Sequence, residues 1–585
     1  MEERIYAILS DPKKKRKVLI YIAIAFLVAV MMIPTKIVLA KMLPGKSANT
    51  FSIYVDTATN SSLADTERVT SCVVQYLKHE PSVQDMEIYL AQGAPLDYAG
   101  LVKGSDFKRM KNQAEIVVNL SDKHHRDEPS FMMVHRIRPE IQALCEPQAT
   151  KATIKFVEMP SGPPTMATIV VNLFGRDHVL MRQTAIKIAD VLKETEGLVD
   201  VDVMQDDIYP FYQIIPDKEK IIRSGLSVEQ VNNILYLAFE GMVVAVKNSQ
   251  TQQDQIPIFV RLDDASRKVE INSKAGLNWK LSRLKLLNHK GMMIPVKEVV
   301  HVNEVPSSPT IFRKDLRDLV TITAECDLVS QVYPLLDARS MMLERLAKDF
   351  NVTKVPGMST YMFDLNLVDK ETGEKLLLRW DGEMKVSLDT FRDLGGAFIA
   401  ALILMFLLMV VYYKSFALSG VILLASFLSI IGVIMGHFVT DIISLIATGT
   451  NFFLTATSLI GFISLMGISA RSSLLLIDFS KALIEKGVEK RRAIAISTAT
   501  RAKPILMTAV AIILGSLLLS TDPIFGGLGV ALIFGSIAAT VVSLFLVPVL
   551  IDNIDAICPM SSDNIPHPHP GEGIKRHIDP DKLGL

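Results

Sequence analysis

The sequence has no net charge, few cysteines and none of the common motifs of enzymes. Its 62 Lys and Arg residues balance its 62 Asp and Glu residues, so no basic field favours a nucleic-acid partner. Four scattered cysteines form no CxxC pair, so neither a zinc site nor a disulfide scaffold is expected from Cys72, Cys145, Cys326 and Cys558. A Walker loop, a nucleophile elbow and a metalloprotease helix are also missing. These absences argue against an enzyme, an ATP site and a bound cofactor.

Long hydrophobic runs, in contrast, are abundant. Hydrophobic residues make up 49% of the 585 positions and the mean hydropathy is +0.32, which is too apolar for an ordinary soluble protein. Six runs are each long enough to span a bilayer as a helix: 18–40, 394–413, 417–437, 451–479, 504–520 and 526–551. The sequence therefore predicts a membrane bundle of six transmembrane helices, with a large soluble region inserted after the first.

The first run has a competing interpretation. The basic run Lys13 to Lys17 followed by an apolar stretch is also typical of a secretory signal peptide, and Val38-Leu39-Ala40 would serve as a cleavage site. Because its apolar core is longer than that of a usual signal peptide, we expect an uncleaved membrane anchor.

Basic residues predict how these helices are oriented. Seven Lys and Arg residues lie between the fourth and fifth runs, and the N-terminus is also basic. The short loops 438–450 and 521–525 contain only Asp441 and Asp522 as charged residues. Because Lys and Arg concentrate on the cytoplasmic side, we expect the N-terminus and the C-terminal end in the cytoplasm and residues 42–393 on the opposite face.

Three polar parts of the sequence have simple expected roles. Asp441 is expected to be solvated in a short loop, and His437, at the adjacent helix end, is expected at the membrane interface. Residues 1–17 are expected to be a cytoplasmic N-terminus. The tail 552–585 is expected to be disordered; its histidines could hold a metal ion, but such tails are more often inert.

The soluble region mixes strands with helices. Short β-branched runs such as TIVVNLFG and LVTITAEC alternate with helical patterns such as Met181 to Glu196. This alternation, with weak internal symmetry, indicates an α+β fold built from repeated strand-helix-strand units.

Candidate functional residues are the polar side chains inside the hydrophobic runs. Arg471 lies in a run that is otherwise apolar or small, and a charge there is costly and usually functional. Arg471 and Asp478 are seven residues apart, as are Arg501 and Thr508, so each pair shares one helix face. The two helices that carry these pairs could thus together form one polar strip within the membrane. Each of these residues also has a simpler interpretation. Arg471 could be structural, Asp478 could lie at the interface, Arg501 could be a cytoplasmic basic anchor, and Thr508 could bond to its own backbone.

Several motifs resemble one family when taken in order. They are SGPPTMATIVVNLFGRD at 161–177, IIPDKEKIIRSGLSVEQVNNIL at 214–235, IPVKEVVHV at 294–302, WDGE at 380–383, YYKSF at 412–416, GISARSSLLLIDFSKAL at 467–483 and RAKPILMTAVAIILG at 501–515. The pattern resembles the C-terminal half of a resistance-nodulation-division (RND) efflux permease.

The resemblance implies a domain plan. It gives one transmembrane helix at 18–40, a ferredoxin-like porter subdomain at 43–160 and a second one at 161–209 and 305–393. A docking subdomain at 210–304 interrupts the second, and five helices follow at 394–551. The whole would belong to a multi-pass protein of the bacterial inner membrane with its large domain in the periplasm.

The resemblance also implies residue roles. Arg471 falls where drug exporters of the family carry a relay lysine, and Arg501 and Thr508 fall on the relay arginine and threonine; Asp478 is added on its spacing. The proton-binding aspartates of the family lie in the other half of a chain about twice this length. An arginine hardly deprotonates, so Arg471 would be a fixed counter-charge to carboxylates of a partner.

The implied function is therefore a half-subunit of a proton-driven secondary transporter. It would need an N-terminal-half subunit, a trimer-like assembly in membrane lipid, and a periplasmic adaptor with an outer-membrane channel, and it would export hydrophobic or amphiphilic compounds. Three alternatives stay open. They are a self-sufficient six-helix homo-oligomer, a non-transporting scaffold, and a copper exporter suggested by the soluble thioethers of Met132, Met133, Met159, Met166, Met292 and Met293 near His135.

Overall fold

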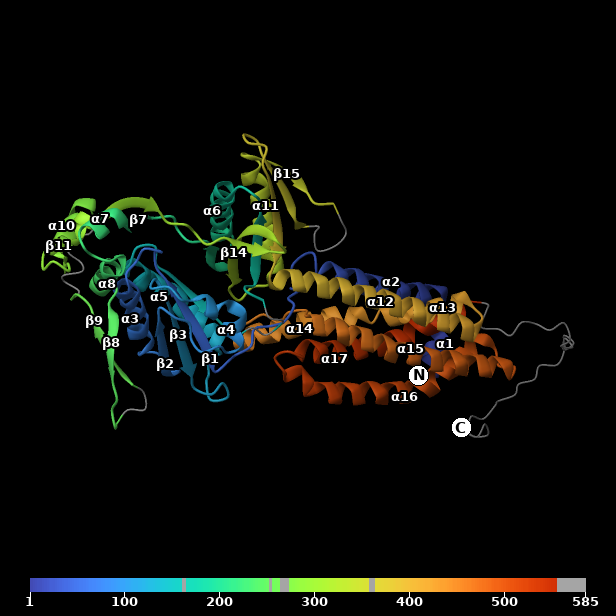
Figure 1. The fold of residues 1–585 in the computed structure, drawn as a ribbon. Coiled ribbons are helices and arrows are strands. Elements are labelled where there is room, and N and C mark those ends of the chain that lie inside the picture. The colour runs from blue at the N-terminus through green and yellow to red at the C-terminus, as the bar shows by residue number, and fades with distance from the viewer. Residues whose placement is uncertain (160–161, 163–164, 252–254, 264–272, 357–362, 555–585) are drawn as a thin grey trace, which may run out of the picture. The chain divides into compact units, whose positions relative to one another are not determined.

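The structure is a computed structural model that describes residues 1–159, 162, 165–251, 255–263, 273–356 and 363–554. The chain forms two compact units (Figure 1). The larger unit comprises Met1–Thr57, Ser62–Met204 and the chain from Arg313 onward, and the smaller comprises Ala58–Ser61 and Gln205–Phe312. The predicted tail at 552–585 lies almost wholly outside the described residues.

The first soluble layer of the larger unit is a four-stranded antiparallel sheet covered by two helices. Its strand order is β2-β3-β1-β4. The elements follow the chain as β1 (Thr50–Asp56), α3 (Leu63–Leu77), β2 (Val83–Leu90), β3 (Gln113–Leu120), α5 (Ser130–Cys145) and β4 (Thr153–Val157), with the short helix α4 (Tyr98–Lys103) before β3. The apolar faces of α3 and α5 bury one continuous core against the sheet.

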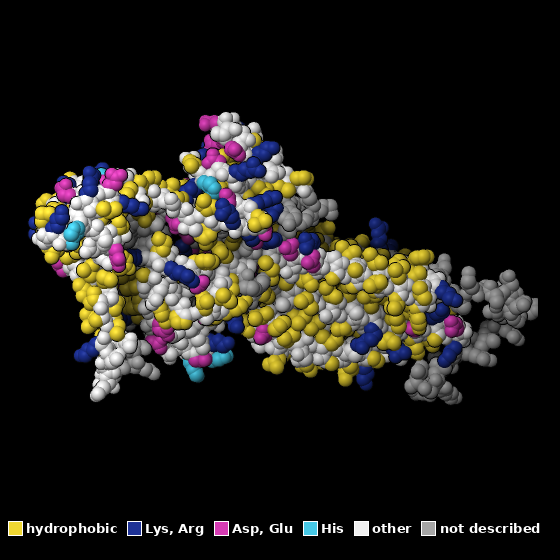
Figure 2. Space-filling model, viewed as in Figure 1, with side chains coloured by type: hydrophobic (Ala, Val, Ile, Leu, Met, Phe, Trp, Pro, Cys, Tyr) yellow, Lys and Arg dark blue, Asp and Glu magenta, His cyan; other side chains and the backbone are white. Residues whose placement is uncertain are grey.

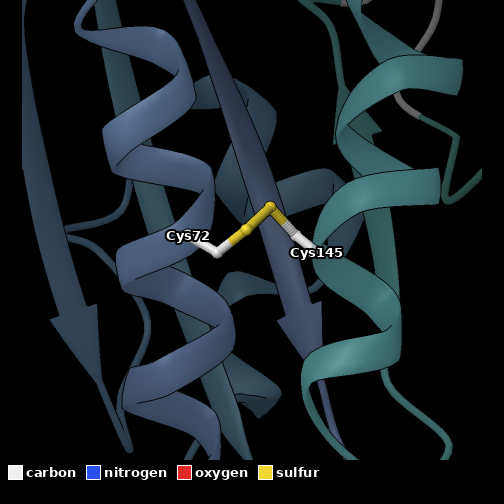
Figure 3. Close-up of a disulfide and its surroundings, with 2 residues drawn as sticks. All are labelled: Cys72 and Cys145. Atoms are coloured by element: carbon white, nitrogen blue, oxygen red, sulfur yellow. A yellow bond between two sulfur atoms is a disulfide. The ribbon is translucent and has the colours of Figure 1, made fainter.

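A disulfide joins the two helices of this layer, which corrects the expectation that the cysteines are unpaired. Cys72 of α3 and Cys145 of α5 are bonded, with their Cα atoms 5.6 Å apart (Figure 3). They are 73 residues apart in sequence, so spacing gives no signal for the pair. Cys326 is a free thiol.

The second soluble layer repeats the first with additions. Its strand order is β13-β14-β5-β17-β16-β15, with β6 also paired to β14. The elements are β5 (Ile169–Phe174), α6 (His178–Glu194), β6 (Leu198–Met204), β13 (Phe312–Lys314), β14 (Arg317–Cys326), α11 (Val332–Leu346), β15 (Phe350–Lys354), β16 (Leu365–Asp369) and β17 (Lys375–Asp381). Every residue of β5 is buried, and this strand pairs with β14 on one edge and with β17 on the other.

The smaller unit contains the range 210–304 that the resemblance assigns to docking. Its elements are β7 (Pro210–Pro216), α7 (Lys218–Arg223), α8 (Val228–Phe239), β8 (Met242–Lys247), β9 (Ile256–Val260), α10 (Lys274–Arg283), β10 (Lys285–Leu287), β11 (Met293–Pro295) and β12 (Val300–Pro306). Strands β8 and β9 pair as an antiparallel arm. Apolar side chains on this arm, including Val243, Val246, Ile258 and Phe259, are exposed, and Figure 2 shows them as a yellow column.

Five helices of the larger unit are long and apolar enough to cross a membrane among the described residues. They are α12 (Glu383–Tyr413), α13 (Phe416–Phe427) with α14 (Ile430–Thr448), α15 (Ala456–Glu485), α16 (Lys490–Leu517), and α17 (Gly526–Val541) with α18 (Val547–Asp552) joined by a π-helical turn. Two predicted loops are shorter than expected. Asp441 lies inside α14, and much of the basic loop belongs to α16.

The N-terminal segment differs most from its prediction. Residues 1–17 are helical: α1 (Glu2–Ser10) buries Ile5 and Leu9, and α2 (Pro12–Met31) includes the basic run. The helix α2 ends at Met31, nine residues before the predicted end at Ala40, because the backbone turns ahead of Pro34. Its apolar part is therefore short, and a sixth span remains a prediction.

Residues that follow α2 are tied to the start of α15. Ala40 forms a parallel bridge with Leu454, supported by backbone hydrogen bonds from Lys41 N–H to the Leu454 carbonyl (3.0 Å) and from Leu454 N–H to the Leu39 carbonyl (2.8 Å). Ser330 donates to the Ala40 carbonyl, and the Ala40 N–H donates to the Tyr333 hydroxyl at 3.4 Å. The second soluble layer is thus bonded to the segment that begins α15.

Candidate functional site

The helix α15 carries the candidate site on one exposed stripe. Half of its residues are buried, and it packs against α13, α16 and α17. From Ile460 to Leu475 the exposed positions recur every three or four residues along a single face: Ile460, Ser464, Gly467, Arg471 and Leu475. A 3.6-residue period therefore produces one uncovered face on an otherwise buried membrane helix. Two of its members, Ser464 and Gly467, are small, so a further helix could approach closely there.

Arg471 lies on this stripe and has no counter-charge among the residues that the structure describes. Its side chain is exposed, and no ion pair or hydrogen bond joins it to any other residue that the structure describes. A guanidinium at the depth of an apolar helix requires compensation by a charge, a polar group or water. The chain as described leaves that requirement unmet.

Asp478 lies two turns beyond Arg471 but is not bonded to it. Its carboxylate accepts hydrogen bonds from two tyrosine hydroxyls at the end of α12: Tyr413 at 2.8 Å and Tyr412 at 3.4 Å. The ring of Tyr413 is buried, while that of Tyr412 is exposed. Asp478 therefore joins α12 to α15, a structural role that the sequence analysis left open beside a functional one.

The predicted pair on α16 is also not joined to Arg471. The Arg501 guanidinium lies over the Phe479 ring of α15, 5.0 Å from its centroid, and its buried Nε has no hydrogen-bond partner within the described chain. The Thr508 hydroxyl donates back to the Ile505 carbonyl at 2.8 Å, which is the ordinary role of a threonine in a membrane helix. The four predicted residues thus occupy adjacent helices without forming a bonded network.

A second polar region, which the sequence analysis missed, joins the two soluble layers. Arg138 of α5 pairs with Asp327 at 2.9 Å and with Asp200 at 3.3 Å. Lys103 pairs with Glu325, and Lys155 pairs with Asp202 and with Asp56. The available signal was the position of Arg138, four residues after Val134 and three before Ile141, which places a charge on the apolar face of α5.

The electrostatics of this junction are unusual at two carboxyl groups. Burial raises the pKa of Glu158 to about 7, with Glu325 and Asp327 adding to the shift and Arg138 opposing it. Asp56 behaves in the opposite way. Burial acts against its charge, but its lysine partners Lys108 and Lys155 outweigh burial and lower its pKa to about 2. The junction therefore holds one carboxyl that titrates near neutrality.

The methionine residues do not gather into one site. Met133 is buried in the core of the first layer, whereas Met292 and Met293 are exposed in the smaller unit. His135 faces the Asp327 carboxylate at 2.7 Å. Within the described residues, no group of three or more His, Cys, Asp or Glu side chains is placed to hold a metal ion.

Comparisons with known proteins give the fold a family. The AcrB/AcrD/AcrF family matches residues 3–352 and 365–554. The chain is 24% identical over 391 residues to the swarming motility protein SwrC of Bacillus subtilis, covering 65% of this chain and 32% of SwrC. It is 24% identical over 410 residues to the cobalt-zinc-cadmium resistance protein CzcA of Cupriavidus metallidurans, covering 68% of this chain and 34% of CzcA.

Solved structures agree with these matches in fold. Two crystal forms of a heavy metal efflux pump superpose with TM-scores of 0.68 and 0.69 at 19% and 18% identity. Each comparison covers 94% of this chain but only 52% and 51% of the pump. The chain spans about a third of the length of these curated relatives and about half of the length of the pump. It belongs to the AcrB/AcrD/AcrF family of RND permeases.

Proposed function

We propose that this chain is a half-subunit of a proton-driven RND exporter and that another polypeptide supplies the carboxylates that answer Arg471. The observation that carries the proposal is the exposed arginine on α15, which has no counter-charge in the described chain. A solitary charge in lipid costs several kcal/mol. A partner helix bearing acidic groups would remove that cost. Proton binding to those acidic groups would then weaken their attraction to Arg471 and so the attraction between the two halves.

The exposed stripe on α15 is the proposed contact surface for that partner. Ser464 and Gly467 permit the close backbone approach that packs membrane helices, and Arg471 follows one turn later. A six-helix half would be completed by α2 as its first span. The matched pump is about twice as long as this chain, which accords with a second half of similar size.

The proposed location is a bacterial inner membrane with the soluble layers in the periplasm. The two basic segments meet at one end of the bundle, because both Lys15 of α2 and Arg491 of α16 pair with Asp552. Positive residues gather on the cytoplasmic side, so the soluble layers face the other way. The Cys72–Cys145 disulfide fits an oxidising compartment.

The soluble elements support porter and docking roles. The order β2-β3-β1-β4 with two helices is that of a ferredoxin-like unit, and β6-β14-β5-β17 repeats it. We assign residues 43–160 to one porter subdomain, 161–209 with 305–393 to the other, and 210–304 to docking. The exposed apolar arm of β8 and β9 would then contact a neighbouring subunit in a trimer-like assembly, with an adaptor and an outer-membrane channel above it.

The junction between the soluble layers favours a cationic cargo. Its acidic side chains outnumber its basic ones. Seven carboxylates, those of Asp56, Glu158, Asp200, Asp202, Glu325, Asp327 and Glu383, interact with five cations, those of Lys41, Lys103, Lys108, Arg138 and Lys155. An excess of carboxylates raises the local concentration of cations. Two cargo classes fit, an amphiphilic organic cation and a metal ion. The second is favoured by the relatives described as cobalt-zinc-cadmium resistance and heavy metal efflux proteins.

Co-purification tests the half-subunit proposal. The tagged chain should capture, at equal stoichiometry, a second membrane subunit with acidic residues inside its helices. The variant Arg471→Ala should lose both the capture and export, whereas Arg471→Lys should retain part of each because it keeps the charge. A purified chain that exports without a partner would show instead a self-sufficient homo-oligomer. Function that survives collapse of the proton gradient would show a scaffold.

A further inference from the structure

A histidine that was expected at the membrane interface is buried inside the helix bundle. His437 of α14 has no exposed surface. Its Nδ1 lies 2.7 Å from the Val433 carbonyl oxygen of the preceding turn, and its Nε2 lies 2.8 Å from the Ser458 hydroxyl of α15. A carbonyl can only accept, so Nδ1 carries a hydrogen and Nε2 faces the hydroxyl with its lone pair when the ring is neutral.

The Ser458 hydroxyl begins a chain of hydrogen bonds that leads away from the ring. Ser458 Oγ lies 3.0 Å from Thr455 Oγ1, which lies 2.8 Å from Thr457 Oγ1. Thr457 Oγ1 lies 3.2 Å from the Ile524 carbonyl oxygen. The three hydroxyl residues are buried, whereas Ile524 is partly exposed in the loop between α16 and α17. The chain therefore runs from a buried ring to the surface.

This surface is on the soluble-domain side of the bundle. Thr455 directly follows Leu454, which pairs with Ala40 at the beginning of the soluble layers. Under the proposed orientation the chain of hydroxyls ends in the periplasm, the side from which protons enter when they drive export.

The hydrogen positions in this chain can have two polarities. With the ring neutral, each hydroxyl donates toward the ring: Thr457 to Thr455, Thr455 to Ser458, and Ser458 to Nε2. With the ring protonated, Nε2–H donates to Ser458 and each hydroxyl donates outward, ending with Thr457 donating to the Ile524 carbonyl. Every donor has an acceptor in the second arrangement, so a charged ring leaves no hydroxyl hydrogen of the chain unsatisfied.

Proton uptake converts the first polarity into the second without rotating any side chain. When a proton reaches Thr457 Oγ1, the original hydroxyl hydrogen of Thr457 moves to the Thr455 hydroxyl. Thr455 then passes its original hydrogen to Ser458, and Ser458 passes its original hydrogen to His437 Nε2. The number of protons on each hydroxyl is unchanged, and the single added proton resides on the ring.

The surroundings keep the neutral ring as the resting form. Burial and the positive end of α15 both oppose an imidazolium, and the other ring neighbour is Phe452, whose ring centroid lies 5.7 Å away. Three charged groups nearby contact residues other than His437. The Asp441 carboxylate accepts from the Phe452 N–H, and the Asp522 carboxylate accepts from the N–H groups of Ile524 and Phe525. The Lys41 ammonium lies over the Phe453 ring.

Gly527 of α17 leaves the space that the hydroxyl chain needs. A Cβ at this position would overlap with Thr455 Oγ1 and Ser458 Oγ. The contact involves two of the three hydroxyls of the chain, so any side chain at 527 would displace at least one of them.

We propose that His437 is a proton-binding site, charged and discharged from the soluble-domain side through the hydroxyls of Thr457, Thr455 and Ser458. The use of this proton in transport rests on the proposed function, whereas its binding does not. A proton on His437 would alter the contact between α14 and α15, and α15 also carries Arg471, so this half would respond to external acidity by itself.

Nitrogen-15 NMR of the full-length, histidine-labelled chain tests the proposal, with His437→Gln used to assign the ring signals. Gln can donate to Val433 and accept from Ser458 but cannot bind the proton. We expect the Nδ1–H tautomer at neutral pH and protonation of Nε2 as the pH is lowered. In Thr457→Val, proton exchange should be slowed about tenfold or more, since one lost hop adds over 1.4 kcal/mol to the barrier.

Two further variants make the result decisive. Thr498→Val is the matched control, because its buried hydroxyl bonds only to its own helix at the Ile494 carbonyl, and exchange at His437 should be unchanged in it. Gly527→Ala should slow exchange as Thr457→Val does. An Nε2–H tautomer, a ring that stays neutral throughout the titration of the folded chain, or equal exchange rates in all variants would overturn the proposal. None of these results would affect capture of a partner through Arg471, so the two proposals fail separately.

Discussion

The Tyr413 hydroxyl donates to the Asp478 carboxylate at 2.8 Å and thereby fastens the last turn of α12 to α15. This bond connects the least buried of the five apolar helices to one of the more buried ones. It is a hydrogen bond to a charged acceptor at a buried ring, which makes it stronger than an ordinary neutral pair.

The first prediction concerns this bond. Tyr413→Phe should lower the stability of the purified chain by about 1.5–3 kcal/mol, the value of a hydrogen bond to a charged group, seen as a lower thermal midpoint in detergent. Tyr412→Phe is the control, since its 3.4 Å contact is longer and its ring is exposed. Asp478→Asn keeps a hydrogen-bond acceptor, so export that persists in this variant would establish a structural role and export that is abolished would establish a coupling role.

The second prediction concerns the exposed stripe on α15. Gly467→Leu should reduce association with the partner half about tenfold or more, because a bulky side chain prevents close helix packing. Nothing lies within 4 Å of a Cβ at Gly467 in this chain, and the same is true at Gly420 of α13. Gly420→Leu is therefore a control of equal volume that should associate normally. Equal association of both variants, measured by co-purification, would show that the partner binds elsewhere.

The third prediction concerns the disulfide. Replacing Cys72 with Ser should destabilise the first soluble layer by about 4 kcal/mol, the loop-closure value for a separation of 73 residues. A reductant should have a similar effect on the wild type and none on the variant. Cys326→Ser is the control because Cys326 is a free thiol, and it should keep the reductant sensitivity of the wild type. Thermal unfolding with and without reductant measures each case.

The fourth prediction concerns pH. The pKa of Glu158 is raised from 4.5 to about 7 in the folded chain, so its contribution to stability is fully present below pH 4.5 and is lost as the pH rises to 7. The loss is at most about 3–4 kcal/mol. Glu158→Gln should therefore be more stable than the wild type above pH 7, with the difference vanishing below pH 4.5. An exposed control, Glu371→Gln, should show no such crossover in unfolding curves recorded across this range.

Length and pattern were sufficient to predict the five long apolar helices, because an apolar run long enough to cross a bilayer seldom forms anything except a membrane-spanning helix. Boundaries were less predictable. The helix α14 continues through Asp441, since that carboxylate caps the Phe452 N–H of the following loop and so does not need water. The helix α2 stops early, and α1 was missed because a nine-residue helix with two buried positions gives little periodic signal.

The candidate site was predictable in position but not in its contacts. A single arginine in an apolar run identifies Arg471, yet only the structure reveals that its face of α15 is uncovered and that Asp478 is bonded to tyrosines. His437 was misassigned to the interface because its burial depends on Ser458, 21 residues later in the chain. The disulfide was missed for the same reason, since contacts between distant segments leave no trace in local spacing.

The backbone pairing between Ala40 and Leu454 determines how force would travel through the molecule. A sliding motion of α15 along its own axis would pull directly on residues 39–42, and Ser330 and Tyr333 would pass that pull to the second sheet. A displacement of α15 inside the bilayer would therefore be transmitted to the soluble layers through direct hydrogen bonds, and it would not be absorbed by a flexible linker.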